Sequence, residues 1–428
     1  MNMRPLSVGE FQPLGTPFAL RLGNLARNPQ RPLGDFSSFV VERLPAVLAE
    51  GEAGLPELLD RVESLAGNVS VDQIHALDGR NQDIARLDLL MPLTGLVHNA
   101  HRADQAPSSG NSLPPLPSWL GHVRERAAGF MGLVEGLSAP AGRLPSITYE
   151  DVALGNPLES DPRLFFTGDV AASEFNFLYG TLVMDRMWGR AIEKLHMARN
   201  NALFIDTYLE DAAALLKAAN DMLPLFREQL PTEHFLTFRN FWAKNPLNGH
   251  DGPSGRFAAK IFHIRVLIDG DRLAEADPGF YPELAKMAPY FPPRDYGALG
   301  ADIRPEFRRS SKSEFDALAH TLAEHGRPSR RTMAEIVRDQ HANNATTLQH
   351  LHQVRVELDR FVSFHIHTVI KHMNQNGAVL AGTGGENDVM VYLLSRTKAH
   401  EKCARLHGQS NGRPPVKTAG FGNAEPKL

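Results

Sequence analysis

Two histidines and a glycine-rich segment are the residues of this chain best suited to chemistry. His365 and His367 lie in the segment LHQVRVELDRFVSFHIHTVIKHM (351–373), and Gly382–Gly385 follows after a short polar connection. A buried neutral imidazole can ligate a metal ion or a haem iron. A glycine-rich loop can order over a bound substrate. The pair therefore predicts a metal or haem site, whereas a core histidine and a plain turn are the alternatives without function.

Helical periodicity selects His365 rather than His367 as the inward residue. In a helix, His367 lies roughly 200° around the axis from His365 and points to the other side. On a strand both would share a face, as in a His-x-His metal site. The apolar residues recur every three or four positions over about six turns, which favours the helix. The predicted inward face consists of Leu351, Val354, Leu358, Phe361, Val362, His365, Val369 and His372.

The glycine-rich segment is more typical of a substrate loop than of a phosphate-binding loop. Phosphate loops lie between a strand and a helix and usually carry a lysine. Here the segment follows a predicted helix and is flanked by Glu386 and Asp388, whose negative charges repel phosphate.

Composition and charge exclude several classes of protein. The 428 residues are 42% hydrophobic and 22% charged, with a net charge of -4 that provides no broad attraction to nucleic acid or anionic lipid. No apolar stretch is long enough to span a membrane, and the first residues lack the apolar core of a signal peptide. The single cysteine, Cys403, excludes an internal disulfide. We expect a cytoplasmic protein without nucleic-acid or membrane partners.

The elements that must position these residues are predicted to be helices throughout, so the expected fold class is all-α. We expect a smaller N-terminal helical domain (1–140), a large helical domain (141–405) that contains both histidines, and a flexible tail (406–428). Residues 142–163 are predicted to be an irregular connection, and the Pro-rich residues 277–305 to wrap the surface. The predicted helices cover residues 36–65 with short breaks at Pro and Gly, 84–98, 119–137, 172–200, 206–230, 310–325, 329–350 and the stretch from 351. Residues 257–268 form an apolar run.

The motifs at the two histidines resemble a known family. SFHIHTVIKHM followed by GTGG is similar to the proximal helix and substrate loop of the indoleamine and tryptophan 2,3-dioxygenases, a haem-dependent family with divergent bacterial relatives in secondary metabolism. The resemblance covers residues 165–405 at low overall identity. It implies haem b as cofactor, with His365 as the iron ligand.

The resemblance also implies residues for the substrate. Phe177 and Thr181 fall on an aromatic residue and a serine of the distal-pocket helix. Arg239 matches the arginine that pairs with the substrate carboxylate, which suits a bidentate guanidinium. Thr383 matches the loop threonine that contacts the substrate, and Gly384 adjoins it.

The haem-side segment and its neighbours contain the departures from the family. Gly252, Ser254 and Gly255 resemble the small residues that lie near the haem. Arg256 follows them as a cofactor-binding candidate. The basic residue expected three positions before the proximal histidine is Val362, so Arg256 or Arg360 is the alternative contact for a haem propionate.

One departure concerns the distal pocket. Five residues before the pocket arginine, where the family often has an aromatic residue, this chain has His234. A histidine there can transfer a proton or hydrogen-bond the indole nitrogen. If His234 faces away, Phe235 takes the pocket position instead.

The resemblance implies an oxygenase that acts on the indole ring of an amino acid with dioxygen. Two inserted oxygen atoms would open the ring, and one would give an oxindole or a rearranged product. Two alternatives belong to other classes: a haem-binding sensor without turnover, and a helical interaction protein without a cofactor. An oligomer is compatible with the sequence.

Overall fold

The part of the chain that the structure describes is built from helices. The computed structural model describes residues 30–104, 125–138, 143–156, 162–224, 230–241, 258–304 and 330–375, with the short pieces 317–318, 320–321, 378–379 and 402. Within these ranges the strands are β1 (Asn374–Gln375) and β2 (Ala378–Val379), an antiparallel pair of two residues each. The predicted all-α fold class is confirmed.

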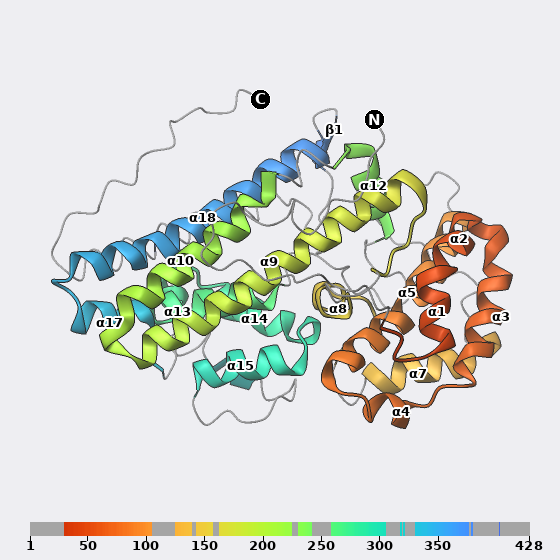
Figure 1. Ribbon diagram of the computed structural model, residues 1–428, viewed down its shortest axis with the longest axis horizontal. Coiled ribbons are helices and arrows are strands. Elements are labelled where there is room, and N and C mark those ends of the chain that lie inside the picture. The colour runs from red at the N-terminus through yellow and green to blue at the C-terminus, as the bar shows by residue number, and fades with distance from the viewer. Residues whose placement is uncertain are drawn as a thin grey trace.

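The first helices pack around α5 (Gly79–Asp104), which is the longest of them (Figure 1). At one crossing, Gly95 of α5 lies against Leu48, and a Cβ at this position would lie 2.4 Å from the leucine side chain. The missing side chain therefore allows the two helices to approach closely. The surrounding elements are α1 (Asp35–Glu42), α2 (Leu44–Ala49), η2 (Gly51–Gly54), α3 (Leu55–Ala66), α4 (Val71–His75) and α7 (Ala128–Ser138).

Three long helices, α9 (Gly168–Asn200), α10 (Ile205–Asp221) and α18 (Ala345–Met373), form the frame of the larger half (Figure 1). The turn η3 (Ala202–Phe204) reverses the chain between α9 and α10. Asp206 at the start of α10 accepts a hydrogen bond from Asn344 (3.3 Å), directly before α18. The two helices therefore start side by side and run parallel, with α9 antiparallel to both.

Shorter helices cover this frame. One of them, α12, packs on α9 and on α18, near the end of α18 and the start of α9 (Figure 1). Another, α13, packs on α9, α15 and α17. The covering elements are α12 (Thr232–Phe241), α13 (Ala259–Ala276), α14 (Phe280–Met287), η5 (Ala288–Tyr290), α15 (Pro293–Ile303) and α17 (Met333–Gln340).

Two clusters of buried apolar side chains fill the interior, one around α5 and one around α9. Leu164 and Phe177 pack against both clusters. Between them lies α8 (Tyr149–Gly155), which packs on α5 and on α9. The cluster around α5 includes Phe165, beyond the predicted domain boundary near residue 140. The division into domains stays a prediction.

Three predicted segments differ from the structure. The connection 142–163 contains α8, which begins in a capping box between Thr148 and Asp151. The Pro-rich segment 277–305 forms helices with a buried face, because a proline at a first helical position, such as Pro293, does not break the helix. The predicted helix 329–350 is interrupted by a turn after α17.

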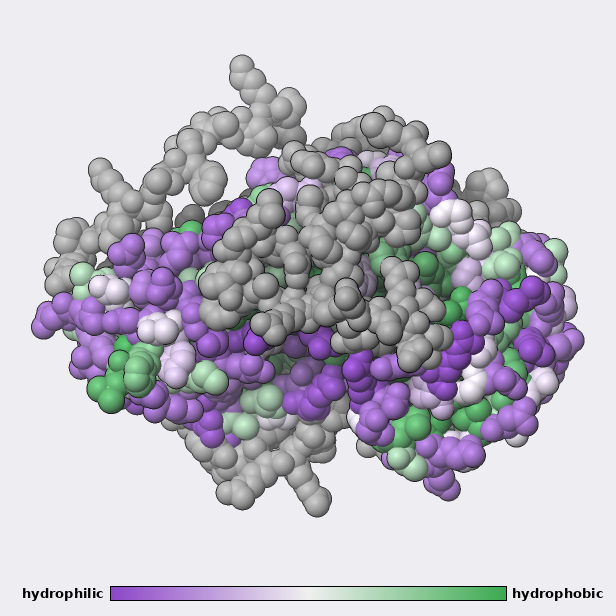
Figure 2. Space-filling view, viewed as in Figure 1, coloured by the Kyte–Doolittle hydropathy of each residue, from purple (hydrophilic) through white to green (hydrophobic). Residues whose placement is uncertain are grey.

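The surface is largely hydrophilic in the view of Figure 2, apart from small green areas. One such area lies at the tip of the α9–α10 hairpin, where Met197, Leu203 and Phe204 are exposed. No helix among the described residues combines the length and apolar character that a membrane span needs.

Candidate functional site

His365 and His367 on α18 have different surroundings. His367 is exposed, and its Nδ1–H donates to the carbonyl oxygen of Ser363 (2.8 Å). His365 is half-buried against Phe361, with 6.0 Å between ring centroids, and burial lowers the pKa of its imidazole. Within the described part of the chain, no residue forms a hydrogen bond with the His365 ring. The helical phase predicted from the sequence agrees with this arrangement.

The inward face of α18 is held against α10. Leu351, Val354 and Leu358 are buried in the larger core. Asn220 of α10 donates both to the carbonyl oxygen (2.7 Å) and to the carboxylate (3.0 Å) of Glu357. These contacts set the rotation of the helix, and the rotation turns His365 inward.

Across from α18, helix α9 carries both distal-pocket candidates. Phe177 is half-buried and Thr181 is buried. Thr181 lies one turn after Phe177, and its hydroxyl donates to the Phe177 carbonyl (2.9 Å). The hydroxyl proton is therefore used inside the helix, and the oxygen keeps lone pairs that can accept a hydrogen bond.

Aromatic contacts give the register between α9 and α18. Trp188 meets Phe361 edge-on with 5.1 Å between ring centroids. Near the other end, Phe177 reaches His372 through Phe235 of α12, with centroid separations of 6.2 and 4.9 Å. The number of residues from Phe177 to Trp188 on α9 equals the number from Phe361 to His372 on α18. This antiparallel register brings Thr181 within about one turn, roughly 5 Å along the axis, of the level of His365.

The adjacent candidates on α12 point to different neighbours. His234 places its Nδ1 2.8 Å from the hydroxyl oxygen of Ser173 on α9. Phe235 contacts Phe177 and His372 instead. The aromatic position beside Phe177 is thus taken by Phe235, which is the arrangement expected if His234 turns away from the pocket.

The remaining predicted residues cannot be placed in this site. The backbone of Arg239 belongs to α12, four residues after Phe235, and its side chain is outside what the structure describes. Two further groups of predicted residues lie outside the described residues altogether. They are Gly252, Ser254, Gly255 and Arg256 on the haem side, and Thr383 and Gly384 in the loop.

His372 is a candidate residue to which the sequence assigned no role. Its side chain is completely buried, with Nδ1 3.1 Å from the hydroxyl oxygen of Thr232. Its Nε2 is buried, and no residue in the described part of the chain forms a hydrogen bond with it. Burial and the neighbouring charge of Lys371 lower its pKa to about 4. The sequence feature that could have identified His372 is its position on the same predicted inward face of the helix as His365.

One group of three potential metal ligands comes together within the described residues, formed by His196, His263 and Asp302. Both imidazoles place Nε2 close to Oδ2 of Asp302, at 3.1 and 2.5 Å. Arg199 and Arg330 hold the other carboxylate oxygen at 2.6 and 3.2 Å. Burial alone would raise the pKa of Asp302, but the hydrogen bonds from both histidines outweigh it and hold the pKa far below its usual range.

The tautomer of His196 argues against a metal ion at this group. Arg199 donates to Nδ1 of His196 (2.8 Å), so the proton of the neutral ring is on Nε2. A metal ion needs the lone pair of that nitrogen. We interpret the group as a charge network that joins α9, α13 and α15, and nothing in the sequence spacing predicted it.

A second charged cluster lies where α8 meets α9 and α13. Lys260 lies 2.8 Å from Asp185 and 3.6 Å from Glu150. Burial raises the pKa of Glu150 to about 8, because the charge of Lys260 offsets only part of the desolvation. These contacts join α8 to α9 and α13.

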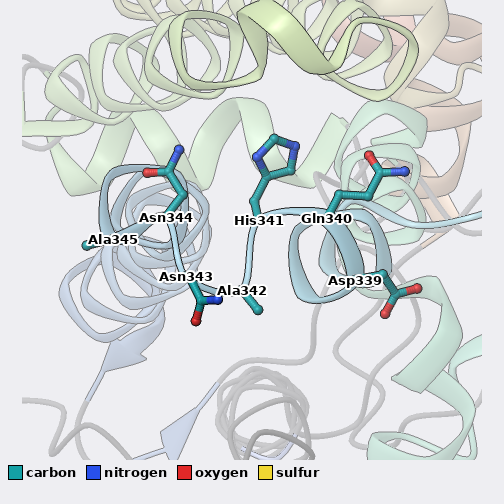
Figure 3. Close-up of a pocket in the computed structure, with 7 residues that line it drawn as sticks. All are labelled: Asp339, Gln340, His341, Ala342, Asn343, Asn344 and Ala345. Carbon is teal, nitrogen blue, oxygen red and sulfur yellow. The ribbon is translucent and has the colours of Figure 1, made fainter.

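A surface hollow of about 590 Å³ lies at the turn between α17 and α18 (Figure 3). Its lining side chains belong to a single continuous segment, 339–345. Within it, Asn344 accepts hydrogen bonds from the N–H groups of Thr346 and Thr347 and thereby caps α18. The hollow contains none of the predicted site residues.

Comparison of the sequence with protein-family models and with curated proteins gives no match. The resemblance to the haem dioxygenases is therefore carried by the motifs alone.

Proposed function

We propose that this protein is a haem-dependent oxygenase that acts on the indole ring of tryptophan or a substituted tryptophan. The observation that carries the proposal is the environment of His365. Burial keeps its imidazole neutral, and no described residue hydrogen-bonds its ring. An iron ligand must offer a lone pair on a deprotonated nitrogen, which a protonated histidine cannot do.

The residues around His365 fit a haem. The ring lies beside Phe361, on the side of α18 that faces α9, and the apolar surroundings suit a large flat cofactor. His365 would hold the iron, and the bound haem would supply the oxygen chemistry while the protein binds and orients the substrate.

Two aromatic rings and an arginine support an indole amino acid as the substrate. Phe177 and Phe235 meet edge-to-face, an arrangement that also suits contact with a third aromatic ring. Arg239 follows Phe235 by one turn of α12, so both positions share a face of the helix. The arginine would bind the substrate carboxylate, and the resemblance adds Thr383 and Gly384 at the amino-acid end.

Thr181 is the polar residue proposed for handling protons in the pocket. It offers acceptor lone pairs, because its proton is donated to the Phe177 carbonyl. His234 is oriented by Ser173 and Phe235 takes the pocket position, so no proton transfer is assigned to His234.

The test is a pair of variants on α18. His365→Ala should lose the Soret band of the purified protein after haem-supplemented expression, because it removes the iron ligand. His367→Ala should keep it, because His367 is exposed and bonded to its own helix. Equal haem retention in both variants would refute the assignment of His365. No Soret band in the unaltered protein would refute the haem proposal itself.

The number of oxygen atoms inserted separates the two products. Mass spectrometry of the product from tryptophan under isotopically labelled dioxygen counts them directly. Two labelled atoms would indicate ring-opening dioxygenation, and one would indicate an oxindole-type product. No turnover by a haem-loaded protein would favour the sensor alternative.

A further inference from the structure

The unpartnered nitrogen of His372 is the starting point. Its side chain is completely buried, and Nε2 has no hydrogen-bond partner among the residues that the structure describes. Native proteins usually provide a buried polar atom with a partner, a water molecule or a ligand, because a buried polar atom without a hydrogen bond is destabilising. The other ring nitrogen is already held by Thr232.

His372 is neutral near pH 7, since burial and Lys371 lower its pKa to about 4. A neutral imidazole has one N–H and one lone pair. If Nδ1–H donates to the hydroxyl of Thr232, the lone pair remains on Nε2. That nitrogen then accepts a hydrogen bond and carries no charge.

The surroundings of His372 indicate what could donate to it. Its ring lies 4.9 Å from Phe235, which in turn contacts Phe177. On α18 it shares the inward face with His365, about 10 Å further along the axis. The free nitrogen therefore adjoins the aromatic pair to which the proposed function assigns the substrate ring.

We propose that Nε2 of His372 accepts a hydrogen bond from a donor on the aromatic ring of the substrate. Such a donor is an indole N–H or a phenol O–H, and an aromatic ring without one leaves the nitrogen unpaired. His372 is therefore a specificity-determining residue. This inference rests on the proposed function for the location of the ring, and extends it by naming the feature of the ring that is recognised.

The experiment compares amino acids that differ in this donor. Calorimetry on the full-length protein measures the dissociation constants of L-tryptophan and 3-benzothienyl-L-alanine, in which sulfur replaces N–H. A second pair, L-tyrosine and L-phenylalanine, tests a phenol donor. We expect the unaltered protein to prefer the donor-bearing member of one pair by about fivefold to tenfold.

Variants of His372 test whether the preference for the donor-bearing ligand depends on its Nε2. His372→Leu should bring the ratio close to one, whereas His372→Gln should retain part of it, because its amide oxygen reaches about as far as Nε2. The exposed His367→Leu is the matched control and should keep the full ratio. The glutamine variant also provides a polar replacement if the leucine variant does not fold.

The outcomes separate this inference from the proposed function. An unchanged ratio in a folded His372→Leu, or no preference in the unaltered protein, would overturn the inference and leave the haem proposal standing. Loss of the Soret band in His372→Leu with retention in His365→Ala would also overturn it, because His372 would then be the iron ligand. If the affinity ratio depends on His372 but the protein shows no Soret band, the inference is supported and the haem proposal is refuted. If the ratio depends on His372 only for the tyrosine pair, the inference is supported and the indole proposal is refuted.

Discussion

At the scale of single residues, the structure distinguishes histidines that the sequence presents alike. His365 has no hydrogen-bonding residue among those described, His372 has one free nitrogen, and His367 is exposed. His234 is bonded to Ser173. Only a neutral imidazole with an available lone pair can bind iron or accept a hydrogen bond from a substrate. These differences select His365 and His372 for the two proposed roles.

A pH prediction concerns Glu174, a completely buried residue one turn before Phe177 and Leu178 on α9. Burial raises its pKa to about 8, and hydrogen bonds from the N–H groups of Phe165 and Phe166 offset only part of this. The folded protein therefore binds a proton that the unfolded chain has lost above about pH 4.5. Its contribution to stability falls as pH rises from about 4.5 to 8, by up to about 1.4 kcal/mol per pH unit.

Glu174→Gln should remove this contribution while keeping an acceptor for the two N–H groups. We expect the free energy of unfolding of the unaltered protein, from urea denaturation at pH 5.5, 6.5 and 7.5, to fall more steeply than that of the variant. Glu150 is present in both proteins and cancels in the comparison. Parallel pH profiles would show that Glu174 is ionised in the folded state.

At the scale of elements, the site depends on how α18 is held. Asp206 and Asn220 near the two ends of α10 contact the parallel helix α18, and α12 spans from α9 to the end of α18. A small rotation of α18 would turn His365 and His372 away from α9. The contacts between α10 and α18 therefore position the proposed site without being part of it.

Asn220→Ala tests the hydrogen bonds between α10 and α18. The variant removes two hydrogen bonds to Glu357, whose side chain is buried, and should lower the free energy of unfolding by about 1–3 kcal/mol. Lys217→Ala on the same helix is the control, because it breaks only an exposed ion pair with Asp221 worth at most about 1 kcal/mol. Chemical denaturation measures both. Equal losses in the free energy of unfolding would mean that the buried hydrogen bonds of Asn220 contribute no more than a surface ion pair.

At the scale of the whole molecule, buried ion pairs join segments that are distant in the sequence. Arg163, just before α9, pairs with Asp88 of α5, and neither side chain is accessible. Ser37 of α1 also donates to Asp88 (2.6 Å), and Arg163 donates to the carbonyl oxygen of Gln30 (2.8 Å). This network connects the first helices to the start of α9, which carries Phe177.

Asp88→Asn should be strongly destabilising, because it removes a buried negative charge that pairs with the guanidinium of Arg163. The expected loss is about 3–5 kcal/mol in the free energy of unfolding. Asp60→Asn is the matched control, since Asp60 pairs with Arg126 on the surface and should cost under about 1 kcal/mol. Guanidinium chloride denaturation compares the two, and a loss in Asp88→Asn as small as in the control would contradict the prediction.

The sequence by itself determined the features that depend on local geometry. Helical periodicity predicted the all-α class and the opposite directions of His365 and His367, because the angle between successive side chains is a property of the helix alone. It failed for residues 277–305, where the Pro-rich composition predicted a segment wrapping the surface, although Pro293 occupies the first turn of α15.

Only the tertiary structure decided which helix faces meet. It brought Phe235 to Phe177 and His372, turned His234 toward Ser173, and buried Arg163 against Asp88. No spacing in the sequence encodes these partners, since each depends on the crossing and rotation of helices that are far apart in the chain. The same packing leaves one nitrogen of His372 buried and free, the feature from which the proposed recognition of the substrate ring follows.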